Sequence, residues 1–502
     1  MQELKELIHF ITHKLSKKEK LLLKSVVTKL EYKLYQGIIN DSFPTDEEAS
    51  MALYNKPSTY QAYRVLKKRL IGSISNLILT YVPAKNDNTT YQKAYFRCWR
   101  QFASIKMLMG EQYNSSAMYL THELLKVTER YNYHDLTLEL YKIIYHNDVS
   151  IQKNKTQKKF VFEKINSLKK IIDLEFDAQT YYTELNSAFA RVKKPDTAAI
   201  RKLATKYDEE LTPYIDVVPS LKFHLYTYLI KYFICHISND FVTGKVVVLK
   251  ALHYFESSKL KHKLSIKLFK RYENECDIHL HNLSSAIPSI LDSIENEEKG
   301  TFSWHRQNEF LFIAYIRNKD YFNAILTCQA VTQNQRFEFQ SSPVKTRWRL
   351  YEMYAYFLAR TLSIDIPTKG FDLKKFIRDT PTFSMDKRAM NIPLIIIQIL
   401  IDIVNNHEEL ILDRANALEK YSGRYLVKGE NFRSKCFIKM LLQLPLRNYH
   451  PIAVKRHTDN YILKLKSEPI EQANQAVEIE IIPYEDLWDL IINFLNNNKK
   501  GL

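Results

Sequence analysis

Glycine scarcity is the sequence feature that most restricts the fold of this chain, which has nine glycines among 502 residues, or about 2%. Globular proteins usually contain about 7% glycine, because tight turns and phosphate-binding loops need a residue without a Cβ atom. Catalytic folds and large sheets that depend on such turns are therefore disfavoured. The other proportions are ordinary, with 45% hydrophobic and 26% charged residues, which excludes a mostly disordered chain and a collagen-like fibre. The length predicts two to four domains or one long repeat array.

Amphipathic helical segments of about 12 to 20 residues, separated by short polar breaks, follow one another from residue 91 to about 450. The breaks fall near Lys194–Asp196, Thr212–Pro213, Glu297–Gly300 and Ser341–Val344. Such segments suggest antiparallel helix pairs that bury their apolar faces only against neighbouring pairs. The sequence therefore predicts an all-α protein in which a small N-terminal helical domain precedes an α-solenoid.

One window, Phe310–Val331 (FLFIAYIRNKDYFNAILTCQAV), resembles a tetratricopeptide repeat. When Ala324 is set at the small-residue position of the second helix, Leu311, Tyr315 and Tyr321 match the Leu, Tyr and Tyr of that family. The resemblance implies a right-handed superhelix of helix pairs with an extended concave surface that binds a peptide or protein.

Other positions depart from the repeat pattern. Asn308 stands where the family prefers Trp, Phe312 where it prefers Gly or Ala, and Arg336 where it prefers Pro. A second window, MLMGEQYNSSAMYLTHELLKV, places Gly110 in the turn and Ser116 at the small-residue position. Several later segments are similar to uncharacterised helical-repeat proteins of Bacteroidota-type bacteria. These resemblances imply a degenerate tetratricopeptide-like array.

Four parts are predicted along the chain. Residues 1–81 form an N-terminal helical domain of three or four short helices, with capping boxes predicted at Ser16 and Thr45. The last of these helices has an apolar stripe formed by Tyr63, Leu66, Leu70, Ile74 and Leu77. The polar stretch 82–90 is a linker. Residues 91–450 form the tetratricopeptide-like α-solenoid. Residues 451–502 form a C-terminal cap with a short strand at Val477–Ile481, where apolar and acidic residues alternate, and a last helix at Tyr484–Leu495.

The five cysteines, an odd number without a C-x-x-C pair, indicate a reducing compartment. The first twenty residues carry Glu3 and Glu6 before a short apolar stretch, which is not typical of a signal peptide. The most apolar run, Ile392–Val404, is too short and too polar to span a bilayer and predicts a buried core helix. We expect a cytoplasmic protein with no membrane insertion.

The formal net charge of +17 favours an acidic or nucleic-acid partner, although A/T-rich codon usage would also enrich lysine. Two basic runs stand out: Ile151–Lys170 has seven lysines and one acid, and Phe255–Arg271 has six basic residues and one acid. Phe160, Phe162 and Phe269 lie among these lysines. Such aromatics either stack on bases of single-stranded RNA or pack between helices beneath a solvated basic face.

Residues 45–70 have the order of a helix-turn-helix, with a short helix, a turn and a longer basic helix. The spacing is imperfect, because Leu53 stands where the turn usually has a glycine. An ordinary helical hairpin with a solvated basic face is the alternative. The candidate nucleic-acid-binding residues are Thr59, Gln61, Arg64, Lys67, Lys68 and Arg69.

Catalytic and cofactor signatures are weak. The only metal-like cluster, Cys276, Asp277, His279 and His281, does not direct three ligands to one face of a helix. His305 and Glu309 have the spacing of an acid/base couple, or of a surface or interface hydrogen bond. No nucleotide-binding glycine motif occurs. We expect no enzymatic activity, no cofactor and no metal.

The function that the sequence favours is a non-enzymatic scaffold or adaptor that holds a protein or peptide partner on the solenoid surface. Charge favours an acidic or amphipathic partner segment. The alternative is a nucleic-acid-associated regulator that uses the basic N-terminal unit.

Overall fold

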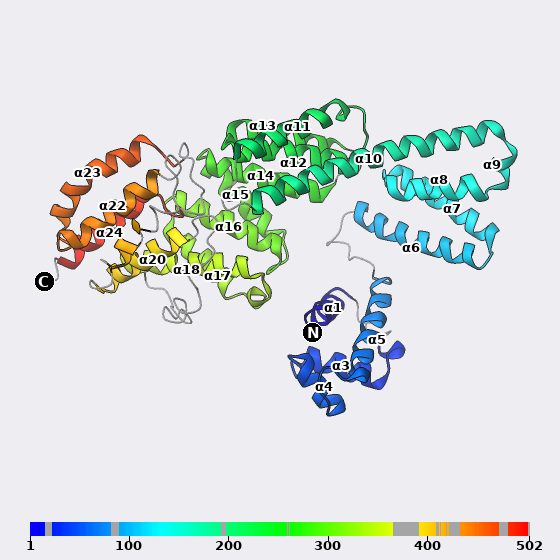
Figure 1. The fold of residues 1–502 in the computed structure, drawn as a ribbon, viewed down its shortest axis with the longest axis horizontal. Helices are drawn as coiled ribbons and strands as arrows, with labels where there is room; N and C mark the ends of the chain where they lie inside the picture. The colour runs from blue at the N-terminus through cyan, green and yellow to red at the C-terminus, as the bar shows by residue number, and fades with distance from the viewer. Residues whose placement is uncertain are drawn as a thin grey trace. The chain divides into compact units, whose positions relative to one another are not determined.

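The computed structural model describes residues 1–15, 23–81, 90–191, 197–258, 260, 262–364, 391–407, 411, 413–417, 419–420, 432–470 and 480–499. Helices are the only regular elements within these ranges, and this confirms the all-α prediction there. The chain divides into two compact units, one of residues 1–172 with 260–262 and one of 173–259 with 263–502. Both are shown in Figure 1, and each is described by itself.

In the described part of residues 1–81, α1 (Gln2–Lys14), α3 (Lys29–Ile39), α4 (Asp46–Tyr54) and α5 (Gln61–Ile78) share one apolar core. The predicted stripe of α5 is confirmed, since Tyr63, Leu66, Leu70, Ile74 and Leu77 are all buried. A capping box that was not predicted begins α3, where the backbone N–H of Glu31 donates to Thr28 Oγ1 and that of Thr28 donates to Glu31 Oε2. The predicted box at Ser16 and residues 82–89 of the predicted linker at 82–90 lie outside the described residues, and Thr90 is already helical.

The rest of the first unit is a run of helices packed in chain order, and the last of them continues into the second unit. They are α6 (Thr90–Gly110), α7 (Asn114–Arg130), α8 (His134–Asn147), α9 (Val149–Lys153) and α10 (Lys155–Arg191). The second repeat-like window falls on α6 and α7, but its register was wrong by one residue. Ser116 is exposed, and Ala117 is the small residue packed at the helix contact.

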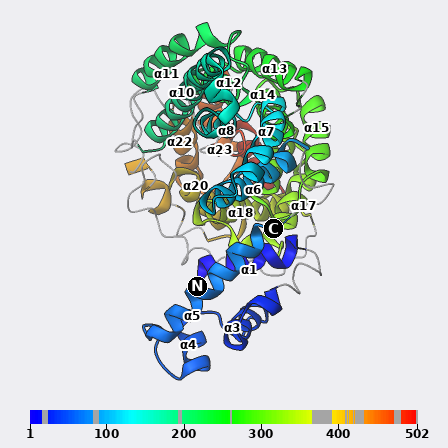
Figure 2. The ribbon, with the colours of Figure 1, turned by 90° about the vertical axis from the view of Figure 1, so that its right-hand side faces the viewer.

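The second unit continues with helices that pack on their sequence neighbours. They are α11 (Thr197–Leu211), α12 (Leu221–Ile237), α13 (Phe241–Ser257), α14 (Lys263–His279), α15 (Leu283–Glu295), α16 (Phe302–Arg317), α17 (Tyr321–Thr332), α18 (Ser342–Thr361), α20 (Asn391–Val404), α22 (Phe432–Leu446), α23 (Pro451–Ser467) and α24 (Tyr484–Lys499). Two short 3₁₀ turns, η1 (Thr212–Tyr214) and η2 (Phe337–Phe339), lie between them. Within this unit, Figure 2 shows α13, α15 and α17 towards the periphery and α12 and α14 nearer the middle.

Asparagine supplies much of the turn geometry that glycine usually provides. Eleven described non-glycine residues have positive φ, and five of them are asparagines. Asn132, Asn239, His281 and Lys319 each lie in the left-handed region one or two residues after a helix ends, and Gln112 does the same after α6. In each of these turns, the N–H of the following residue donates a hydrogen bond to the backbone carbonyl five residues before it. The N–H of Asp240, for example, donates to the carbonyl of Cys235. The chain thus turns sharply between helices with few glycines.

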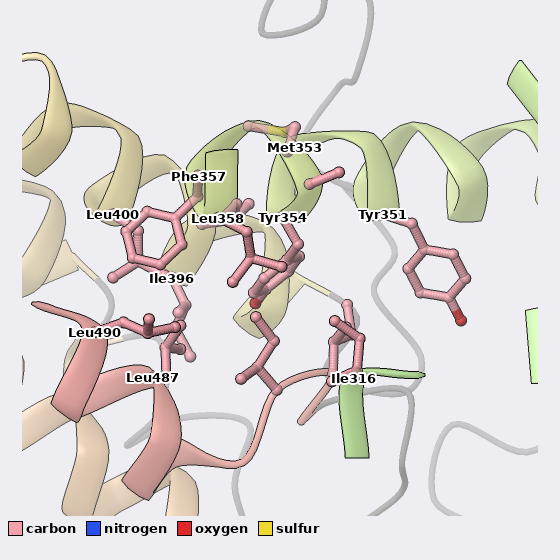
Figure 3. Packing of buried hydrophobic residues seen from close by; sticks show 14 of the residues in the cluster. Ile316, Tyr351, Met353, Tyr354, Phe357, Leu358, Ile396, Leu400, Leu487 and Leu490 are labelled. Carbon is pink, nitrogen blue, oxygen red and sulfur yellow. The ribbon is translucent and has the colours of Figure 1, made fainter. Parts of the chain in front are cut away.

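The core of the second unit runs from α14 to α24 and includes the most apolar segment of the chain. Ile392–Val404 forms most of α20, and its buried residues confirm the predicted core helix. Figure 3 shows Leu487 and Leu490 of α24 beside Ile396 and Leu400 of α20, with Phe357 of α18 nearby. The last helix therefore returns to α18 as well as packing on α23.

A buried arginine holds this C-terminal end together. Arg433 on α22 is 1% exposed and donates to Glu480 and Glu485 and to the backbone carbonyls of Leu465 and Glu468. Burial raises the pKa of Glu480, and this effect is larger than the lowering of the pKa by Arg433. Most of the predicted strand at Val477–Ile481 lies outside the described residues, and its last two residues, which are described, are not in a strand.

Replacing Arg433 with methionine should lower the local free energy of unfolding of α22–α24 by about 3–5 kcal/mol, because it leaves the carboxylate of Glu480 buried without a cation. Hydrogen exchange of the α22, α23 and α24 amides measures this loss. The control is Arg456→Met on the exposed side of α23, which should change protection little. Equal protection in both variants would contradict the role assigned to Arg433.

Candidate functional site

The predicted nucleic-acid-binding residues lie at the start of α5, and five of the six are exposed. Thr59 is in the turn before the helix, and Gln61, Arg64, Lys68 and Arg69 are on its solvent side.

Lys67 differs from the other five residues, because its Nζ donates to Asp46 Oδ1 at 2.9 Å across the α4–α5 contact. Burial raises the pKa of Asp46, but hydrogen bonds from the Met1 amino group, Tyr63 and Lys67 outweigh it and lower the pKa to about 2. Lys67 therefore stabilises the hairpin and is not available to a ligand in the same way as its neighbours.

The connection between α4 and α5 is longer than that of a typical helix-turn-helix. Six residues separate Tyr54 from Gln61, whereas the motif usually has a turn of three or four. This connection is well ordered, since Ser50 Oγ donates to the carbonyl of Pro57 and the N–H of Ser58 donates to Glu47 Oε2. The two helices form a braced hairpin with a basic outer face.

A hollow of about 560 Å³ lies beside this basic face. Its lining includes Leu30, Tyr54, Tyr60 and Val65, together with one cation, Arg69. The rings of Tyr54 and Tyr60 meet edge to face, with centroids 5.5 Å apart. A mainly apolar lining that contains one cation suits an apolar side chain that has a carboxylate next to it.

The two basic runs have different structures. Phe255 and Phe269 are fully buried and their rings are stacked, so the aromatics of the second run belong to the core. In the first run, Phe160 and Phe162 on α10 are 54% and 50% exposed. Packing between helices, which was one of the two predicted alternatives, is therefore confirmed for Phe269, whereas Phe160 and Phe162 are only half buried.

Two helices of the second unit are apolar on both sides. On α13, Val242, Val246 and Leu249 are 66%, 50% and 44% exposed, while Val248 and Ala251 on the opposite side are fully buried. On α17, Phe322 and Leu326 are more than two-fifths exposed, opposite the buried Ala324 and Cys328. The sequence analysis did not single out these residues, although their spacing of three and four positions was a signal for a second apolar stripe.

A row of polar side chains crosses α12, α14, α16 and α18 in the second unit. Tyr232 donates to Glu275 Oε2 at 2.8 Å. Burial raises the pKa of Glu275, but His236, Arg306 and Tyr232 outweigh it and lower the pKa to about 2. Further along, Glu309 accepts from Arg306, Arg347 and Tyr351. These groups satisfy one another, as buried polar networks usually do.

The metal-like cluster is dispersed among other partners. Asp277 Oδ1 accepts from Lys245 Nζ at 2.6 Å, and His279 stacks on Phe241 with ring centroids 3.7 Å apart. Cys276 is buried beside Tyr232, and His281 lies in a turn. No set of three or more His, Cys, Asp or Glu side chains in the described part of the chain is arranged to hold a metal ion.

The predicted couple of His305 and Glu309 does not form. Glu309 is bound by arginines, and His305 is 2% exposed with no hydrogen-bond partner on either ring nitrogen. Burial lowers the pKa of His305. Its ring packs edge to face on Trp304 and near Phe337, so the residue acts as part of the core.

Comparisons with known proteins add no relative, since no family model, curated protein or solved structure matches this chain. Within the described helices, none is long and apolar enough to cross a bilayer. The surfaces that remain for function are the basic face and hollow of the N-terminal helices, the start of α10, and the outer faces of α13 and α17.

Acid should destabilise the contact between α13 and α14 through His279. Burial lowers the pKa of His279 to about 4, so the unfolded chain binds a proton between pH 6.5 and 4 that the folded chain does not bind. The stabilisation is present above pH 6.5 and is lost as the pH falls towards 4. Between pH 7.5 and 5.5 this site accounts for about 1.4 kcal/mol.

His279→Phe keeps a stacked ring and should reduce the loss of α13–α14 protection in hydrogen exchange between these two pH values. His457→Phe, at an exposed position on α23, is the control. If His279→Phe loses as much protection as the unmodified chain, His279 is not the group that titrates.

Proposed function

We propose that this chain is a non-enzymatic scaffold or adaptor, and that its helical array is a degenerate tetratricopeptide-like α-solenoid that holds a protein partner. The observation that carries the proposal is the second apolar stripe on α13, formed by Val242, Val246 and Leu249. A surface helix normally has polar residues on the side opposite its buried apolar face. The exposed stripe therefore fits a surface that a partner covers.

The recurring turn supports the solenoid part of the proposal. The left-handed residues Asn239, His281 and Lys319 follow α12, α14 and α16 and are 42 and 38 residues apart. Each is followed by the first residues of another helix, so one helix pair repeats at about 40 residues. This period is a few residues longer than the ~34 of a regular tetratricopeptide repeat and close to the ~40 of other helical-repeat arrays.

The apolar faces define the chemistry of the partner. Burying the exposed parts of three branched side chains contributes on the order of 3 kcal/mol. Lys250 and His253 border the stripe on α13, and Gln329 borders Phe322 and Leu326 on α17. An amphipathic helix with acidic residues along one edge would match these borders.

The five cysteines support placing this function in the cytoplasm. All five are buried and none forms a disulfide. Burial raises the pKa of each thiol, which keeps these side chains in the unreactive protonated form. A protein of this kind needs no oxidising environment for its fold.

Replacing both Val246 and Leu249 with glutamate should abolish partner binding without unfolding α13, because exposed substitutions usually change stability by less than about 0.5 kcal/mol. A photoreactive amino acid at Val242 first identifies the partner in the native cells. The affinity of the purified partner for each variant is then measured by calorimetry, and we expect a loss of at least tenfold for the double variant.

The matched control replaces Ile452 and Leu463 with glutamate, since both are exposed apolar residues on another helix, α23. This control should keep the native affinity. Unchanged binding by the α13 variant, or an equal loss in the control, would remove the basis for the proposal.

A second candidate function, the nucleic-acid-associated regulator, is supported by Arg64, Lys68 and Arg69. These three cations are exposed near the start of α5, and no acidic residue occurs within that helix. Changing all three to glutamine should reduce the slope of log affinity against log salt for a duplex DNA by about 3. Fluorescence anisotropy measures this slope.

Lys24, Lys29 and Lys33 are also exposed in the N-terminal helices, so their triple glutamine variant removes the same charge from another face. Duplex binding that responds equally to both triple variants would count against a site on α5.

A further inference from the structure

The first turns of α10 carry an unusual combination of exposed rings and lysines. Phe160 and Phe162 are about half exposed, and they flank the side of the helix that buries Val161, Ile165 and Leu168. Leaving a phenylalanine in water forgoes the gain from burying apolar surface. These two rings therefore do not serve the core of the first unit.

Lysine side chains are held against these rings. Lys158 Nζ lies 5.4 Å from the ring centroid of Tyr145 on α8, and Tyr145 lies 5.9 Å from the ring of Phe162. Lys158 Nζ also donates to Gln152 Oε1 at 2.7 Å, which fixes its position. On the other flank, Lys164 Nζ lies 5.6 Å from the ring of Phe160. Tyr145 and Phe160 thus each have a cation beside them, and Phe162 adjoins Tyr145.

The charge of the chain is concentrated in this segment. Residues 151–170 hold seven lysines and one acid, so about a third of the formal charge of +17 lies in 20 residues. The single acid, Glu163, is 3.9 Å from Lys159, a long contact between exposed groups that neutralises little. Codon usage would spread lysines over the whole surface and does not explain this concentration.

We propose that this surface, formed by Tyr145, Phe160, Phe162 and the lysines of residues 153–170, binds single-stranded nucleic acid. Bases stack on the exposed rings, and the lysines contact the phosphates that follow one another along the strand. The segment contains no arginine, which fits binding to phosphates as point charges without recognition of base edges. The site is separate from α5 and from α13, and it does not rest on the scaffold function.

The geometry favours a flexible strand over a bilayer or an acidic peptide. Phe160 and Phe162 are two positions apart on a helix, so they project about 160° from each other. A flat membrane cannot receive both rings at once, whereas a single strand can pass over the helix. An acidic peptide would match the lysines, but its carboxylates would leave the rings without a stacking partner.

Fluorescence anisotropy of the full chain with labelled 20-nucleotide oligo-dT and oligo-U tests the proposal. The change of Lys155, Lys158, Lys159 and Lys169 to glutamine should reduce the slope of log affinity against log salt by about 3. The control changes Lys202, Lys222, Lys270 and Lys455 to glutamine, which removes the same charge from exposed positions of the second unit. That control should keep both affinity and slope.

Phe162→Ala and Phe160→Ala test stacking separately from charge. Each should weaken oligonucleotide binding by about fivefold or more and leave heparin binding unchanged, because heparin has charge but no bases. Phe339→Ala, which truncates a highly exposed ring elsewhere, is the control. Circular dichroism and thermal unfolding show whether each variant is folded.

Three results would overturn the proposal. The first is equal weakening of heparin and oligonucleotide binding by the phenylalanine variants, which would indicate a polyanion surface without stacking. The second is tighter binding to vesicles containing phosphatidylserine, or to poly-glutamate, than to either oligonucleotide. The third is an equal loss of oligonucleotide affinity in the two lysine variants, which would show that binding depends only on the net charge of the chain.

Discussion

From α6 onward, the described helices bury their apolar faces mainly on the helices that precede and follow them, and this constraint determines what remains at the surface. The constraint depends on sharp turns between helices. Asparagine, histidine, lysine and glutamine in the left-handed region make these turns, at a local cost that only asparagine tolerates easily. Because one helix side is enough to build the core, a second apolar side or an exposed ring has no structural need. Such features are therefore informative about binding.

The C-terminal end is the exception to packing in chain order. Arg433 connects α22 with the residues around Glu480 and with the start of α24, and this brings α24 onto α18. Lys319 after α16 adds an ion pair to Asp486 at 2.6 Å. An array that ended without such a contact would leave the apolar side of its last helices in water. The buried charge is costly by itself, but four groups that accept hydrogen bonds surround it and offset much of that cost.

The sequence alone predicted the helical class, the amphipathic stripe of α5, the buried α20 and the hairpin of α16 and α17, because these follow from local periodicity and capping. It could not predict that Lys67 binds Asp46 or that Arg433 binds Glu480, since these partners are 21 and 47 residues apart. It also left open whether Phe160 and Phe162 pack or stack, because exposure depends on which neighbours cover a helix. The scaffold and nucleic-acid functions stay predictions. A spacing signal for the stripe on α13 was present in Val242, Val246 and Leu249.

The exposed surfaces differ in chemistry, and this difference separates their ligands. The stripe on α13 has branched aliphatic side chains bordered by Lys250 and His253, so its ligand must supply apolar area, with acidic residues only along an edge. The surface at the start of α10 has planar rings with lysines against them, and such rings favour a partner that is both flat and anionic. A protein helix satisfies the first description and a nucleic acid strand the second. Because the two surfaces share no residue, one chain could hold both ligands at once and bring a protein to a single strand.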